Sequence, residues 1–81
     1  MGPEFLMEIM EIREAIESAK EDETIQRLWD ANQARISDTV SRLQQAFDND
    51  DLDDALQLAA ELQYWNRAQE TLKDKSPLLL R

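Results

Sequence analysis

Apolar residues recur every three or four positions along most of the chain, and this spacing constrains the fold more than any other feature. Phe5, Ile9, Ile12, Ile16 and Ala19 follow one another at intervals of four, three, four and three residues. This interval places them on one face of a helix. The chain has only one glycine and two prolines, so few positions interrupt a helical pattern. We therefore predict an all-α fold.

Two short acidic breaks, at residues 21–24 and 48–51, divide the chain into three predicted helices. We expect these helices to span about Glu4–Lys20, Thr24–Phe47 and Leu52–Lys73, with a stop at Ser76-Pro77. Asp22 or Thr24 is expected to cap the second helix. Because short breaks join antiparallel neighbours, the predicted architecture is a three-helix up-down-up antiparallel bundle.

The two ends of the chain differ from its helical part. Residues 1–4 resemble a remnant of an expression vector, since Gly-Pro is similar to a protease-site scar and Glu-Phe to a cloning site; Phe5 could belong to it. Residues 78–81 are a short apolar tail. A chain of 81 residues makes at most one small domain, which we expect to span residues 5–77.

Each of the later helices also carries an apolar stripe. On the second helix the stripe is Ile25, Leu28, Trp29, Asn32, Ile36, Val40, Leu43 and Phe47. On the third helix it is Ala55, Leu58, Ala59, Leu62, Trp65, Gln69 and Leu72. Asn32 is polar within its stripe, and we expect it to be partly exposed near the bundle end rather than buried as an amide that fixes the register.

The composition excludes several kinds of site. The chain contains no cysteine and no histidine, which removes thiolate and imidazole metal ligands and histidine-based catalysis. Its net charge of −9 disfavours nucleic acids and anionic membrane surfaces, and no apolar run approaches the ~20 residues of a membrane span. We expect no catalytic residues, no metal, no cofactor, and no nucleic-acid or membrane partner.

Five aspartates around the second break suggest a calcium loop, but their spacing does not fit one. An EF-hand loop needs a glycine at its sixth position and a glutamate at its twelfth. Counted from Asp48, these positions hold Asp53 and Ala59. We expect a turn followed by an acid-rich helix N-terminus instead.

Several apolar residues are not needed for the core. On a wheel of 100° per residue, Met7 and Met10 point away from the core face of the first helix, and Leu6 could belong to the edge of that face. Tyr64 points away from the core face of the third helix. Turns centred near residues 22 and 50 would place Tyr64 at a level between those of Leu6 and Met10 along the axis of the bundle. We expect a patch of Leu6, Met10 and Tyr64 rimmed by Glu11, Arg13, Glu14, Glu17 and Arg67.

This patch has more than one interpretation. An apolar centre with adaptable methionines and a charged rim is typical of a helical protein-binding surface. Scattered exposed apolar residues are also normal on monomers. The alternative function is a structural or self-associating helical module that uses the same patch as a homodimer interface.

The segment Phe5–Ala15, FLMEIMEIREA, resembles the Phe-Leu-Met-Glu-x-x-Glu-x-Arg-Glu signature of a known family. That signature opens the C-terminal domain of HscB, a J-domain co-chaperone of iron–sulfur cluster biogenesis. The acidic turn before Ala55, the segment Ala60–Trp65 and the Leu72-Lys73-Asp74 ending are similar as well, so the resemblance covers residues 5–77. The Trp after Tyr64 and the Leu-Lys-Asp ending resemble fungal mitochondrial members.

The resemblance implies a partner and a binding surface. In that family this domain binds an IscU-type scaffold protein, while the J-domain stimulates the ATPase of a dedicated heat-shock chaperone. The implied contacts are Leu6, Met10 and Tyr64 as apolar anchors, with Met7, Glu11 and Glu14 around them. The resemblance also implies the mitochondrial matrix, with the bacterial cytoplasm as the alternative, and we expect a monomer.

The chain departs from the family pattern in two respects. The J-domain depends on a His-Pro-Asp motif, and a chain without histidine cannot act as a full co-chaperone. Gln63 stands where the family has a basic residue before the aromatic, which puts one charged contact in doubt. We therefore interpret the chain as the scaffold-binding part alone.

Overall fold

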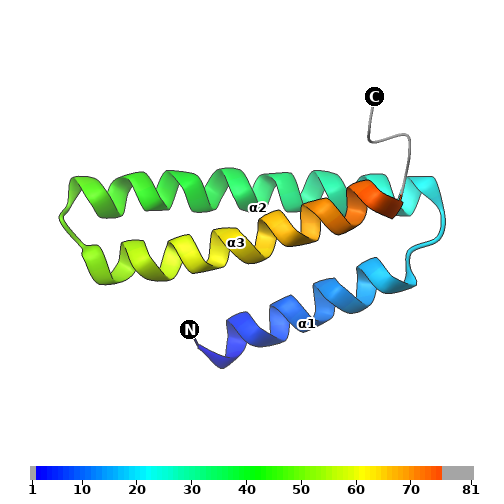
Figure 1. Cartoon of the computed structure of the whole chain (residues 1–81), viewed down its shortest axis with the longest axis horizontal. Helices are drawn as coiled ribbons and strands as arrows, with labels where there is room; N and C mark the ends of the chain where they lie inside the picture. Colours follow the sequence, from blue (N-terminus) through cyan, green and yellow to red (C-terminus); the bar gives the residue numbers. More distant parts are fainter. Residues whose placement is uncertain (1, 76–81) are drawn as a thin grey trace.

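The computed structural model describes residues 2–75 and contains three helices (Figure 1). They are α1 (Pro3–Ser18), α2 (Asp22–Asp48) and α3 (Leu52–Lys75). In Figure 1, α1 and α3 run in one direction and α2 runs in the other. The predicted all-α, up-down-up bundle is confirmed, and each helix end lies within two residues of its predicted place. The predicted stop at Ser76-Pro77 and the tail 78–81 lie outside the described residues.

The first two helices begin without a side-chain cap. Pro3 occupies the first turn of α1, where the missing N–H has no intrahelical partner in any case. The N-cap of α2 is Glu21, whose side chain makes no capping hydrogen bond, so the prediction that Asp22 or Thr24 caps α2 is wrong. Helix α2 starts earlier than expected and takes in Asp22 and Glu23, whose charges favour its positive end.

The turn between α2 and α3 is held by backbone geometry and by one aspartate. Asp50 adopts a left-handed conformation with φ 55°, which aspartate tolerates better than most residues. The Asp51 N–H donates to the Ala46 carbonyl over 2.8 Å. The Asp51 carboxylate then accepts the N–H of Asp54 over 3.3 Å, as an N-cap does. The expected turn and acid-rich helix start are confirmed.

The longer helices α2 and α3 pack as an antiparallel hairpin, and the shorter α1 lies beside α3 (Figure 1). The molecule is flat, with extents of 43 × 29 × 15 Å. Near the start of α1, the Phe5 ring contacts Tyr64 and Trp65 in the middle of α3. The end of the hairpin that carries the 49–51 turn therefore extends beyond α1 (Figure 1).

Two apolar clusters form the core. One contains Ile16, Ala19, Ile25 and Leu72 and joins all three helices near the 19–21 connection. The other contains Ala46, Ala55 and Leu58 near the turn of the hairpin. Between them the seam of α2 is polar, because Asn32 and Thr39 are buried there.

The buried positions of α2 correct part of the predicted stripe. Val40 and Phe47 were expected in the core, yet Phe47 is 57% exposed and Val40 is exposed as well. Thr39 and Ala46, one position earlier, are buried instead. Small side chains at these positions let α2 and α3 approach closely, and α1 packs mainly against α3, so no helix covers the flank that carries Val40 and Phe47.

Asn32 is the second correction, because it is 1% exposed rather than partly solvated. Its Nδ2 donates to the Trp65 carbonyl and to Gln69 Oε1, both over 2.7 Å. A buried amide whose hydrogens are both used can fix one register between two helices. Asn32 is therefore a buried amide of the kind that fixes the register, and the expected partial exposure is wrong.

Candidate functional site

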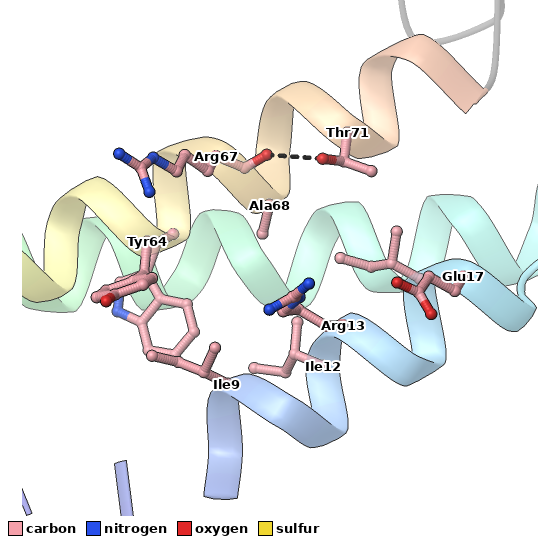
Figure 2. A pocket seen from close by; sticks show the side chains of 10 residues that line it. Ile9, Ile12, Arg13, Glu17, Tyr64, Arg67, Ala68 and Thr71 are labelled. Carbon is pink, nitrogen blue, oxygen red and sulfur yellow. Dashed lines mark hydrogen bonds between the residues drawn. The ribbon is translucent and has the colours of Figure 1, made fainter. Parts of the chain in front are cut away.

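A cavity of about 400 Å³ opens between α1 and α3 (Figure 2). We call it the α1/α3 groove. From α1 it is lined by Ile9, Ile12, Arg13, Ile16 and Glu17, and from α3 by Tyr64, Trp65, Arg67, Ala68 and Thr71.

The floor of the groove is apolar because it is made by core residues. Ile9, Ile16 and Trp65 are all buried, and they belong to the same stripes that attach α1 to α3. The floor is thus as rigid as the core beneath it. The polar side chains stand around this floor, with Arg13 and Glu17 on α1 and Arg67 and Thr71 on α3 (Figure 2).

An aromatic cluster adjoins the groove, because Phe5 contacts Tyr64 and Trp65, which line it. The Phe5 ring meets Tyr64 edge-to-face at 5.9 Å and 73°, and it meets Trp65 at 5.4 Å and 83°. Edge-to-face pairs of this kind are favoured by the quadrupoles of the rings. Phe5 therefore anchors α1, as its place in the stripe predicted, and it also supports Tyr64, which the sequence did not reveal.

The predicted patch residues of α1 point outward, as the helical wheel predicted. Leu6 is 50% exposed, Met7 61% and Met10 60%. Glu11 and Glu14 are exposed on the same helix. None of these five lines the groove, so a contact of theirs with a partner stays a prediction.

The position of Leu6 and Met10 relative to the groove follows from helix geometry. Leu6, Met10, Arg13 and Glu17 are spaced by four, three and four residues, which aligns them along one edge of α1. Arg13 and Glu17 line the groove, so Leu6 and Met10 continue the same wall toward the start of α1. Tyr64 lines the groove from α3. The α1 wall of the groove thus has an apolar end at Leu6 and Met10 and a charged end at Arg13 and Glu17.

A contact network beside the groove ties the three helices together. Arg35 of α2 donates through Nε to the Glu8 carboxylate of α1 over 3.2 Å. Its guanidinium also lies 5.6 Å from the centre of the Trp65 ring, within the range of a cation–π contact. No sequence pattern pointed to Arg35, because its partners lie 27 and 30 positions away in the chain.

Glu61 lies on α3 three residues before Tyr64 and has an altered acidity. Burial raises the pKa of the Glu61 carboxyl above its ordinary value, since the charged form loses solvation. Arg42 opposes this effect, while Glu8 and Asp54 add to it. The shift has a structural origin and does not place an acid in the groove, because Glu61 does not line it.

The described residues offer little for metal chemistry or for a membrane. Across residues 2–75, carboxylates do not gather in groups of three or more that could hold a metal ion. None of α1, α2 and α3 is apolar enough over sufficient length to cross a bilayer.

Comparison with known proteins bears on this surface. Residues 1–73 match the family described as "HSCB C-terminal oligomerisation domain". The mitochondrial J-type co-chaperone jac1 of Schizosaccharomyces pombe is 34% identical over 89% of this chain and 32% of its own length. The mitochondrial J-type co-chaperone JAC1 of Saccharomyces cerevisiae is 27% identical over 93% of this chain and 41% of its own.

A human relative also matches over only part of its own length. The iron-sulfur cluster co-chaperone protein HscB of Homo sapiens is 27% identical over 93% of this chain and 32% of its own length. This chain thus spans roughly a third of the curated relatives that it matches. No solved structure matches it. The family match covers nearly the whole chain and confirms the resemblance seen in the sequence: the chain belongs to the family of HscB C-terminal domains.

Proposed function

We propose that this chain is a protein-binding module of an iron–sulfur cluster co-chaperone and that its α1/α3 groove docks an IscU-type scaffold protein. The observation that carries the proposal is the position of Leu6, Met10 and Tyr64 at one end of a preformed groove. Leu6 and Met10 are at least half exposed, and Tyr64 lines the groove. Family membership and the printed roles of the relatives support a co-chaperone context.

The mechanism is recognition rather than catalysis. The rigid floor of the groove would let the three anchors meet the scaffold with little rearrangement, and the methionines can adapt to its surface. The scaffold would then be delivered to a heat-shock chaperone of the iron–sulfur pathway, which a J-domain outside this chain would stimulate. We place this activity in the mitochondrial matrix, since two fungal relatives are named mitochondrial.

The direct test is calorimetric binding of a purified IscU-type scaffold to the parent chain and to a Leu6→Ala/Met10→Ala/Tyr64→Ala variant. True hot-spot anchors cost about 2 kcal/mol or more each on truncation, so the variant should lose measurable binding. Its circular dichroism spectrum should match that of the parent, because all three side chains are at least partly exposed.

A matched control uses the opposite end of the hairpin. Phe47, Leu52 and Leu56 are also exposed, and they lie where the hairpin extends beyond α1 (Figure 1). A Phe47→Ala/Leu52→Ala/Leu56→Ala variant removes one aromatic and two aliphatic side chains, and it should bind as tightly as the parent. Equal affinity of the groove variant and the control would refute the docking site.

A second candidate is self-association through the same patch. The family description names an oligomerisation domain, and exposed apolar side chains can equally serve a second copy of the chain. Sedimentation of the parent over a wide range of concentration distinguishes the two functions. A monomer at every concentration would eliminate the homodimer, whereas a dimer abolished by the groove variant would favour it.

A further inference from the structure

One face of α2 carries no charged side chain. We call it the uncharged α2 face, and its seven residues follow one another at alternating intervals of three and four: Gln26, Trp29, Gln33, Ile36, Val40, Leu43 and Phe47. This alternation is the heptad spacing of a coiled-coil seam. Every charged residue of α2 falls outside the series, although 33% of the chain is charged.

The packing of the three helices leaves this face open. Trp29, Ile36 and Leu43 are partly buried, whereas Val40 and Phe47 are exposed. Helix α1 packs mainly against α3, so none of the described helices covers this side of α2 (Figure 1). A heptad seam normally packs against another helix, and here the second helix is missing.

The face holds a recess and an apolar side chain that could fill it. A cavity of about 370 Å³ is lined by Trp29, Gln33, Ile36 and Ser37 of α2 and by Gln69 of α3. Val40 lies one turn after Ile36 on the same helix and is 37% exposed. If an antiparallel second copy sets its residue 40 level with residue 33, each Val40 meets the recess of the other copy. The two-fold axis of such a pair passes near residues 36 and 37.

The charge of the chain also favours a second copy as the occupant. Each copy has a net charge of −9, so two copies repel each other wherever their acidic residues meet. The uncharged α2 face brings no carboxylates of the series into opposition. A basic partner would gain no ion pair from these seven residues, because none of them is acidic.

We propose that two copies of the chain associate through the uncharged α2 face, as an antiparallel pair of α2 helices about a two-fold axis near residues 36 and 37. This interface involves neither wall of the α1/α3 groove, so the inference is independent of the proposed docking of a scaffold. The family description names oligomerisation but no face of the domain. The inference replaces the expected monomer by a dimer.

Sedimentation equilibrium of the parent, of a Gln33→Glu/Gln44→Glu variant and of a Gln45→Glu/Gln57→Glu control tests the proposal. All four glutamines are exposed, so both variants keep the core and add two negative charges. Gln44 lies one turn after Val40, beside the seam, whereas Gln45 and Gln57 line a different cavity. The first variant should weaken the dimer at least about tenfold, because its carboxylates would lose water against apolar side chains. The control should change it little, and added salt should tighten the parent dimer by screening the repulsion.

A crosslink tests the arrangement of the two helices. The chain has no cysteine, so Ser37→Cys supplies one thiol per copy beside the two-fold axis. Ser41→Cys is the control, since it lies one turn further along α2 and outside the series. A short bismaleimide should join two copies of the first variant and leave the control uncrosslinked.

Several results would overturn the inference. A parent that is monomeric at every concentration, or a dimer that the two glutamate variants weaken equally, would refute it. A dimer that is lost only in the Leu6→Ala/Met10→Ala/Tyr64→Ala variant would assign self-association to the α1/α3 groove instead. If Gln33→Glu/Gln44→Glu abolishes scaffold binding and leaves sedimentation unchanged, the face belongs to the scaffold.

Discussion

At the scale of single residues, Asn32 shows how a polar side chain specifies the hairpin. It contacts both the backbone and a side chain of α3, yet its own Oδ1 and the Nε2 of Gln69 are buried without a hydrogen-bond partner among the described residues. Such a site adds less stability than a fully satisfied network. The hydrogen bonds of Asn32 instead specify the register between α2 and α3, because a shift of α3 along α2 would leave more buried polar atoms without partners.

We predict that Asn32→Leu lowers the free energy of unfolding by about 1–3 kcal/mol, because it leaves Gln69 Oε1 buried without a donor. Replacing both residues, as Asn32→Leu/Gln69→Leu, should recover most of that loss, since no polar group then remains unpaired. Urea unfolding of the two variants and the parent measures both effects. A single variant as stable as the parent would contradict the role given to Asn32.

A second prediction at this scale concerns Glu61. Burial raises its pKa in the folded chain, so the folded state binds a proton more readily than the unfolded state. The charged carboxylate therefore destabilises the fold above its folded pKa, and this penalty disappears as the pH falls through that value toward the ordinary one. Glu61→Gln should raise the melting temperature at neutral pH and have little effect in acid. The same increase at both pH values would contradict the assigned cause.

At the scale of the helices, periodicity predicted the existence of all three and their ends to within two residues. It also identified the residues that attach α1, because Ile9, Ile16 and Ala19 are buried. It failed on α2, where Val40 and Phe47 lie one position after the buried Thr39 and Ala46. Hydrophobicity favoured the larger side chains, whereas the close approach of two helices needed the smaller ones. A helical wheel describes one helix and carries no information about the distance between two helices.

The helices should also differ in stability. Helix α1 is shorter and lies on one side of a hairpin that packs along its whole length (Figure 1), so it should open before α2 and α3 do. Hydrogen exchange should show faster exchange in the amides of α1 than in the middle of α2. Scaffold binding in the groove should slow exchange in α1 most. Equal protection of α1 and the hairpin would contradict this order.

At the scale of the whole molecule, the sequence predicted the proposed docking surface only in part. Wheels and hairpin arithmetic placed Leu6, Met10 and Tyr64 on the exposed side of adjoining helices. They did not reveal the groove itself, because its floor depends on how closely α1 approaches α3 in three dimensions. They also missed Phe5 as the support of Tyr64, and they could not show that Arg13 and Arg67 form no ion pair with any other described residue.

Charge is distributed unevenly over the same molecule. No lysine or arginine lies between Arg42 and Arg67, so the hairpin end with the 49–51 turn is strongly acidic. The groove is instead lined by Arg13 and Arg67, which form no ion pair within residues 2–75. The α1/α3 groove therefore combines apolar and cationic side chains, whereas the end of the hairpin with the 49–51 turn does not.

We propose that the α1/α3 groove, and no other face of the described helices, receives the scaffold. The most direct measurement is a titration of the isotope-labelled chain with purified scaffold, followed by nuclear magnetic resonance at every backbone amide. We predict that shift changes and broadening concentrate around Leu6, Met10, Arg13, Tyr64 and Arg67 and leave residues 45–56 unaffected. Changes centred on residues 45–56, or a spectrum that does not respond to the scaffold, would contradict the claim.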